Sequence, residues 1–128
     1  MSDQASHEEV VESTAATEDQ MPPQKVPVNV YEASGALVVV APMPAVMPKD
    51  VCVELRPGCL RFWAHVRSAG PREYLVHEWD YGGYEREVDL PEGYGAGVEA
   101  TMANGQVVIR VLRGEPVDQL VSIEPKEK

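Results

Sequence analysis

The chain has 128 residues, enough for one hydrophobic core of ordinary size and too few for two. Its 11 basic and 21 acidic residues give a formal net charge of −10, which repels nucleic-acid phosphates and anionic membrane surfaces. The composition therefore predicts one domain with tails and argues against nucleic acid as a partner.

No segment has the sequence of a membrane span. The longest apolar stretch, residues 36–47, is interrupted by two prolines and is much shorter than the roughly 20 residues that cross a bilayer. The N-terminus lacks the basic region and apolar run of a secretory signal. We expect a soluble, cytoplasmic protein with no membrane partner.

Residues 1–25 differ from the rest of the chain. They carry six acidic residues and no aromatic residue, whereas all eight aromatics lie between Tyr31 and Tyr94. Such a segment buries too little apolar surface to offset its ordering entropy. The sequence predicts a disordered acidic N-terminal arm over residues 1–25 and a core that begins at Val26.

From Val26 onward the hydrophobic period is two, which is typical of strands. Gly, Pro or Asn closes most of the runs, and no amphipathic helix is evident. Short strands separated by turns predict an all-β protein, either an antiparallel sandwich or a barrel. The expected strands are residues 26–31, 36–41, 51–56, 59–66, 73–79, 84–90, 98–103 and 106–112.

Both cysteines fall in an expected hairpin that turns at Pro57 and Gly58. Placing all its apolar residues on one face pairs Val51, Val53 and Leu55 with Ala64, Phe62 and Leu60. Cys52 then lies opposite Trp63, several residues from Cys59. At roughly 3.3 Å per strand residue, that separation exceeds the roughly 7 Å limit for a disulfide, so both thiols are expected to be free, which fits a reducing compartment.

Arg86 interrupts an otherwise apolar stripe. Tyr84, Val88 and Leu90 share its face, while the acidic residues of the same run share the other. Two interpretations remain open: the arginine extends to water from a strand edge, or it is buried against a carboxylate at a subunit contact.

The sequence contains no nucleophile elbow, phosphate loop or dinucleotide fingerprint. Cys52, Cys59, His65 and His77 lack the short spacings that make a metal site convincing. Carboxylates alternate with apolar residues and form solvated strand faces. We therefore expect a protein that is not an enzyme and has no cofactor and no metal.

Several stretches together resemble the small heat-shock proteins, whose shared unit is the α-crystallin domain. "APMPAVMPKDV" resembles the family's A-x-x-P-G-V loop and the strand start that follows it. "YEREVDLP" is similar to its F-x-R-x-F-x-L-P stretch, and "ATMANGQVV" to its A-x-x-x-N-G-V-L signature. The resemblance covers residues 26–113, and "VSI" falls where the family carries an I-x-I tail motif.

The match has departures. Ala45 stands where the loop usually has glycine, which is compatible with the fold only if its backbone does not need a positive φ. Gln106 and Val107 replace the valine and leucine of the last signature.

The resemblance implies an immunoglobulin-like β-sandwich over residues 26–113, followed by a flexible C-terminal tail over residues 114–128. In the family, the tail motif docks as an extended strand into an apolar groove of a neighbouring subunit. Val121 and Ile123 are then the docking residues, because alternate residues of an extended chain point the same way. The groove candidates are Val51, Val53, Leu55, Val98, Ala100 and Met102.

The resemblance also implies a homodimer. The stretch Tyr74, Leu75, Val76, His77, Glu78 and Trp79 resembles the strand that bacterial and plant members exchange between protomers, pairing it with the partner's first strand, here residues 26–30. The alternative is an ordinary hairpin strand in its own sheet. Because the arm is short and lacks aromatics, we expect a dimer or small oligomer.

Three functional hypotheses follow. The first is an ATP-independent holdase chaperone of the stress response that binds unfolding client proteins and limits their aggregation. The second is an adaptor or co-chaperone that binds one specific partner through the sandwich and tail, and the polar arm favours it. The third is a redox- or metal-dependent protein that uses the two cysteines and the nearby histidines.

Overall fold

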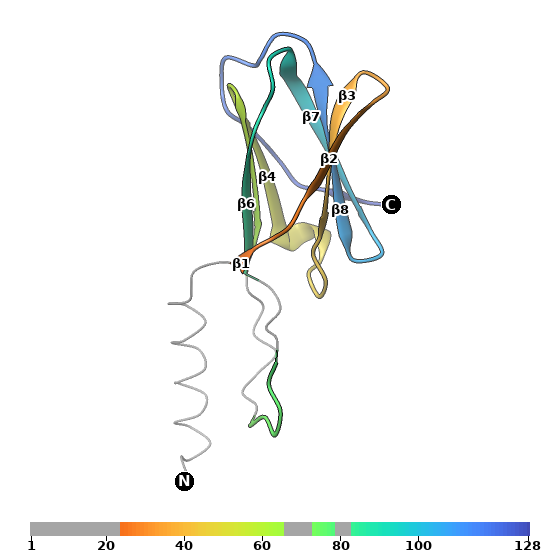
Figure 1. Cartoon of the computed structure of the whole chain (residues 1–128), viewed down its shortest axis with the longest axis vertical. Helices are drawn as coiled ribbons and strands as arrows, with labels where there is room; N and C mark the ends of the chain where they lie inside the picture. Colours follow the sequence, from red (N-terminus) through yellow and green to blue (C-terminus); the bar gives the residue numbers. More distant parts are fainter. Residues whose placement is uncertain (1–23, 66–72, 79–82) are drawn as a thin grey trace.

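The computed structural model describes residues 24–65, 73–78 and 83–128 of the chain. Two five-stranded sheets face each other as the layers of a sandwich (Figure 1). The first sheet has the order β1-β6-β5-β4-β9 and the second the order β10-β7-β8-β3-β2. The predicted immunoglobulin-like sandwich is confirmed, and the barrel alternative is wrong.

The strand bounds are as follows. In the first sheet, β1 is Gln24–Lys25, β6 is Tyr84–Asp89, β5 is Cys59–Ala64, β4 is Val51–Arg56 and β9 is Val121–Ile123. In the second sheet, β10 is Lys126–Glu127, β7 is Tyr94–Ala103, β8 is Gln106–Arg113, β3 is Ala36–Pro42 and β2 is Asn29–Ala33. One 3₁₀ turn, η1 (Pro48–Asp50), leads into β4.

The core lies between the sheets and is built by alternate residues of each strand. In the β4–β5 hairpin, Val53 pairs with Phe62 and Leu55 with Leu60, and all four side chains are fully buried. Cys52 pairs with Trp63 on the outer face, and both cysteines are free. The register predicted from the apolar pattern is therefore confirmed.

The second sheet supplies the other half of the core. Its buried inward side chains are Leu37, Val39 and Ala41 of β3, Val107, Ile109 and Val111 of β8, and Ala100 and Met102 of β7. The run of residues 36–41 has apolar side chains on both faces of β3, since Val38 is buried and Val40 half-buried on the face away from the core.

Several segments differ from the predicted strand bounds. The strand predicted at residues 26–31 is found as β2 at Asn29–Ala33, and the strand predicted at residues 59–66 is found as β5 at Cys59–Ala64. β7 begins at Tyr94 and not at Val98, because a bulge between them lets the glycine-rich stretch remain in the ladder. Residues 73–78 form no strand in the single chain, so the alternative of an ordinary hairpin strand in its own sheet is wrong.

The chain changes sheet just after β1. β1 pairs in parallel with β6, and the chain then passes to β2 of the other sheet (Figure 1). Val26, at the crossing, is 2% exposed and belongs to the core. Gln24 and Lys25, which the sequence assigned to a disordered arm, are thus part of the first sheet; the rest of that expected arm, residues 1–23, lies outside the described residues.

Candidate functional site

The C-terminal tail lies along the sandwich of its own chain. β9 pairs antiparallel with β4, with Val121 opposite Leu55 and Ile123 opposite Val53. Because Leu55 and Val53 face the core, this register turns Val121 and Ile123 inward as well. Both are partly buried and pack against the core, while Ser122 points outward opposite Glu54.

The residues expected to line the groove come from two strands on the same side of the sandwich. Without β9, β4 would be the edge of the first sheet, and β7 has only the two-residue β10 beyond it in the second. Strand β9 contacts both β4 and β7, so the tail fills the opening between them. Of the six candidates, Val51, Val53, Leu55, Ala100 and Met102 are buried, and Val98 is partly buried against the core.

Two tail residues that sequence reasoning missed also hold this segment. Pro125 is buried and continues the alternation of Val121 and Ile123, a period-two signal that reads directly from the sequence. Val117 packs against the core, and its backbone N–H donates to the Gly95 carbonyl over 2.9 Å. The docked segment therefore extends well beyond the three residues of the V-x-I motif.

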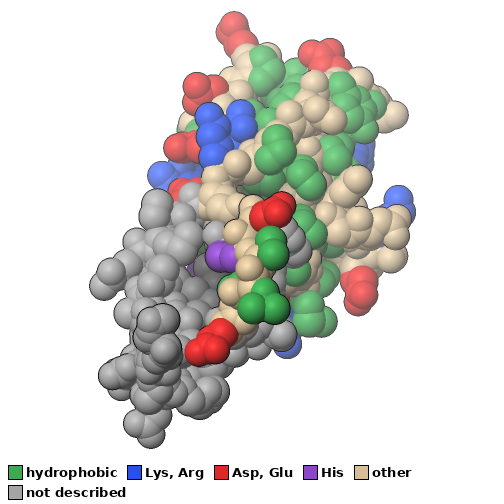
Figure 2. All heavy atoms as spheres, turned by 60° about the horizontal axis from the view of Figure 1, so that its bottom comes forward, with side chains coloured by type: hydrophobic (Ala, Val, Ile, Leu, Met, Phe, Trp, Pro, Cys, Tyr) green, Lys and Arg blue, Asp and Glu red, His purple; other side chains and the backbone are tan. Residues whose placement is uncertain are grey.

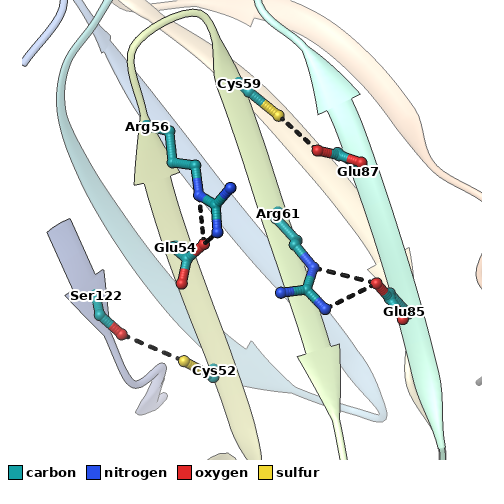
Figure 3. Close-up of polar contacts among 8 residues, drawn as sticks. All are labelled: Cys52, Glu54, Arg56, Cys59, Arg61, Glu85, Glu87 and Ser122. Carbon is teal, nitrogen blue, oxygen red and sulfur yellow. Dashed lines mark hydrogen bonds and ion pairs between the residues drawn. The ribbon is translucent and has the colours of Figure 1, made fainter. Parts of the chain in front are cut away.

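The outer face of the first sheet carries polar pairs beside the tail (Figure 3). The Sγ of Cys52 lies 3.3 Å from the Oγ of Ser122, which links β4 to β9. Arg61 bridges β5 to β6 through Glu85 at 2.9 Å and stacks over Trp63 at 4.4 Å. These exposed contacts contribute little stability one by one, but they leave this face charged and hydrated.

The two thiols lie in different surroundings on this face. Cys59 donates to Glu87 Oε1 over 3.2 Å, whereas Cys52 contacts Ser122 (Figure 3). Burial, followed by the hydrogen bond and the negative charge of Glu87, raises the pKa of the Cys59 thiol to about 11. A thiol with this pKa is a poor nucleophile at neutral pH.

A shallow depression of about 280 Å³ lies where the tail meets the start of β4. It is lined by Lys49, Asp50, Val51, Cys52, His65, Ser122, Ile123 and Glu124. Across residues 24–65, 73–78 and 83–128, no group of three or more His, Cys, Asp or Glu side chains is arranged to hold a metal ion.

Arg86 makes a contact that neither interpretation of the sequence anticipated. Its side chain is half-buried, and its Nη1 donates to the backbone carbonyl of Val26 over 3.1 Å. The arginine therefore fixes the crossing between β1 and β2 within its own chain. Pairing with a carboxylate of a second subunit stays a prediction.

The stretch expected to form an exchanged strand is exposed in the single chain. Leu75 is 102% exposed, Val76 71% and Tyr74 53%, and the ring of Tyr74 stacks on His77 at 4.4 Å. Glu78 is also exposed, and Trp79 lies outside the described residues. Figure 2 brings forward the end of the molecule that carries this loop and shows hydrophobic side chains exposed beside carboxylates.

Strand β2 lies at the open edge of the second sheet. Among the residues that the structure describes, it pairs with β3 alone, and all five of its residues are exposed. This edge and the exposed loop are the two elements of the predicted dimer. Among the described residues, no helix has the length and hydropathy to cross a membrane.

The fold and this edge site together define a class: an immunoglobulin-like β-sandwich that holds an extended apolar segment between the edges of its two sheets. The family model of the Hsp20/alpha crystallin family matches residues 29–125. The chain therefore belongs to this family, that of the small heat-shock proteins, which are chaperones and not enzymes. A comparison with curated protein sequences gives no significant match.

Solved structures of small heat-shock proteins share the fold. HspA from Xanthomonas axonopodis is 24% identical, with a TM-score of 0.64 over 73% of this chain and 98% of its own. A small heat-shock protein from Xylella fastidiosa is 21% identical, with a TM-score of 0.61 over 73% of this chain and 90% of its own. Heat shock protein 16.0 from Schizosaccharomyces pombe is 20% identical, with a TM-score of 0.58 over 75% of this chain and 93% of its own.

Proposed function

We propose that this protein is an ATP-independent holdase that binds extended apolar segments of unfolding proteins and limits their aggregation. The observation that carries the proposal is the opening between β4 and β7, which accommodates an extended segment with apolar side chains at alternate positions, Val121 and Ile123. An unfolding chain exposes segments of this kind. Family membership supports the same conclusion.

Binding in this opening combines two physical terms. The edge of β4, which β9 of the same chain occupies, offers a client that displaces β9 backbone hydrogen bonds that are independent of the client's sequence. The apolar positions on the core side select apolar residues. Burying two such side chains contributes about 3 to 5 kcal/mol before ordering costs, and those costs leave a weak, reversible contact. Weak binding of many sequences is what a holdase requires.

We further propose a homodimer formed by strand exchange. Support comes from the open edge of β2 and from the exposed apolar side chains of Tyr74, Leu75 and Val76. Pairing residues 74–79 of one protomer with the first strand of the other would cover both surfaces and protect an edge from aggregation. We also assign the protein to the cytoplasm, which the two free cysteines support.

The experiment is light scattering of a heat-labile client protein, with and without an equimolar amount of this protein and without ATP. Three forms are compared: the full chain, a chain ending at Glu115, and the Val121→Ser/Ile123→Ser double variant. We expect the full chain to suppress scattering and both tail variants to suppress it to a different extent. No suppression by any of the three forms would contradict the holdase function.

The same variants test whether the tail links subunits. If Val121 and Ile123 mediate assembly, the double serine variant changes the oligomer distribution measured by sedimentation velocity. An unchanged distribution would show that the two residues act only within their own chain.

A second function has one observation in its favour. The N-terminal residues 1–25 are acidic and free of aromatics. The acidic charge supplies solubility by repulsion, but the segment offers clients no aromatic side chain. This composition favours an adaptor that binds one partner through the sandwich and tail. Failure to suppress aggregation, together with retention of a single protein on an affinity column carrying the full chain, would support the adaptor.

A further inference from the structure

The tail changes sheets immediately after β9. Residues 121–123 pair with β4 of the first sheet, and residues 126–127 pair with β7 of the second. Pro125 lies between them, and a proline has no N–H with which to continue the β4 ladder. The residue before it, Glu124, is restricted to extended backbone. The proline therefore ends β9 and directs the chain across the opening.

Residues Pro125–Lys128, here called the terminal segment, hold the second sheet by backbone contacts. Lys126 pairs with Thr101 and Glu127 with Met102 in parallel register, and the Lys128 N–H donates to the Met102 carbonyl over 3.1 Å. The side chains of Lys126, Glu127 and Lys128 are exposed, while Pro125 is buried. The attachment thus depends on one apolar side chain and on strand pairing.

The V-x-I motif is consequently fixed on both sides to β7 of its own chain. Before it, the Val117 N–H bonds the Gly95 carbonyl, and after it the terminal segment pairs with Thr101 and Met102. A motif held only by Val121 and Ile123 could leave the groove and reach another subunit. A motif that is also held on both sides can leave the groove only after its flanking residues have broken their backbone hydrogen bonds to β7.

We propose that the terminal segment keeps the tail in its own groove and so closes the groove between β4 and β7 to any other extended segment, including the tail of a second copy, until residues 125–128 detach. This inference rests on the proposed function, because it concerns the regulation of the same groove. It assigns Pro125 as the positioning residue of the tail.

The consequence for binding is quantitative. A ligand that needs the open groove has an apparent affinity reduced by the fraction of molecules in which the groove is open. The tail is tethered, so its effective concentration at the groove is high. Loss of the buried Pro125 side chain and of the backbone pairs between β10 and β7 should raise the fraction of molecules with an open groove about tenfold.

The test compares four proteins: the full chain, a chain ending at Glu124, a Pro125→Ser variant, and a Lys126→Ala/Glu127→Ala variant. The chain ending at Glu124 retains the V-x-I motif and loses only the terminal segment. Pro125→Ser is the milder change should truncation disturb the fold, which circular dichroism checks. The double alanine variant is the matched control, because it changes two exposed side chains and leaves the backbone pairing intact.

The probe is a fluorescent synthetic peptide of residues 117–124, whose binding is followed by fluorescence anisotropy, together with amide hydrogen exchange at residues 121–123. We expect the chain ending at Glu124 to bind the peptide about tenfold more tightly than the full chain and to exchange these amides faster. Pro125→Ser should be intermediate, and the double alanine variant should match the full chain.

Equal peptide affinity and equal amide exchange in the full chain and the truncated chain would overturn the inference, as would the absence of peptide binding to every form. Because no unfolding client takes part, the outcome is separable from that of the scattering experiment. A difference in peptide affinity without holdase activity would refute only the proposed function. Holdase activity without a difference in affinity would refute only the role of the terminal segment.

Discussion

Ala45 adopts a backbone conformation that L-residues other than glycine rarely hold. Its φ is +66°, and its side chain is exposed. A β-carbon in the left-handed region costs about 1 to 2 kcal/mol, whereas glycine pays mainly for its greater freedom in the unfolded chain. Alanine would suit this loop only with a negative φ, and Ala45 has a positive one. The backbone is therefore strained at this residue.

We expect Ala45→Gly to raise the free energy of unfolding by about 0.5 to 1 kcal/mol, since it relieves this strain and removes no packed side chain. Urea unfolding measures the change. Gly58→Ala is the matched control: Gly58 has a φ of +77° with no atom within 4 Å of the added β-carbon, so only backbone strain should lower its stability. Destabilisation by Ala45→Gly would contradict the assignment.

Cys59 should react slowly with electrophiles. With its pKa raised from 9.0 to about 11 by burial and by Glu87, its thiolate fraction at pH 8 is about one hundredth of that of an unperturbed thiol. The folded-state pKa lies above the unfolded value, so the protonated thiol contributes stability that is complete below about pH 9 and lost as the pH rises to about 11.

The measurement is the rate of iodoacetamide alkylation against pH in a Cys52→Ser background. We expect the midpoint for Cys59 to lie near pH 11. Glu87→Gln removes the carboxylate charge and should move the midpoint to lower pH and speed alkylation at pH 8. A midpoint near that of a free thiol in both proteins would show that Glu87 has no influence.

Strand β2 and the loop around Leu75 are the elements on which the proposed dimer depends. Leu75 is 102% exposed in the single chain, so it contributes nothing to the stability of one protomer. Burying an unpaired carboxylate at an interface is costly. We therefore expect Leu75→Asp to weaken dimerisation at least about tenfold and to leave the unfolding free energy of the protomer within about 0.5 kcal/mol.

Sedimentation velocity over a range of concentrations measures the dimer, and urea unfolding the protomer. Met47→Asp is the control, because Met47 is an exposed apolar residue outside this loop, 50% exposed, and the charge change is the same. Equal dimerisation by Leu75→Asp and the unsubstituted chain would exclude the loop from the interface.

At the scale of the whole molecule, the first and the last strands of the described chain help to close the sandwich. On one side the chain passes from β1 on the first sheet to β2 on the second, and on the other side the tail passes from β9 to β10. Each crossing places apolar residues against the core, with Val26 on one side and Val117, Val121 and Ile123 on the other. The strands β1, β9 and β10, which flank the central part of the fold in sequence, are thus parts of the two sheets.

A fragment of residues 26–113, the span of the family resemblance, should be less stable than one of residues 24–128. The shorter fragment lacks β1, β9 and β10 and the apolar tail residues. Partial burial of those residues, after subtraction of their ordering entropy, contributes about 2 to 4 kcal/mol to the free energy of unfolding. Urea unfolding of the two fragments checks this, and the larger one should unfold in a single transition with a larger m-value. Equal midpoints would mean that the tail docks without stabilising the sandwich.

The sequence by itself determined most of the core strands and the register of the β4–β5 hairpin. The alternation in residues 51–64 predicts that Val53 lies opposite Phe62, because a slip by one residue would turn every apolar side chain outward. The family resemblance predicts Val121 and Ile123 as docking residues, and the period of two places both side chains on one face of the extended tail. Such signals are local: they depend only on the period of the strand and on which side chains avoid water.

The tertiary structure alone decided how distant segments meet. It pairs the tail with β4 of the same chain and buries Pro125. It also brings the Arg86 side chain to the Val26 backbone carbonyl, to which it donates a hydrogen bond, and sets a positive φ at Ala45. Each of these depends on the position of one sheet relative to the other and on which edge remains open when they pack. No short stretch of sequence contains that information, because an open strand edge accepts any extended segment that reaches it.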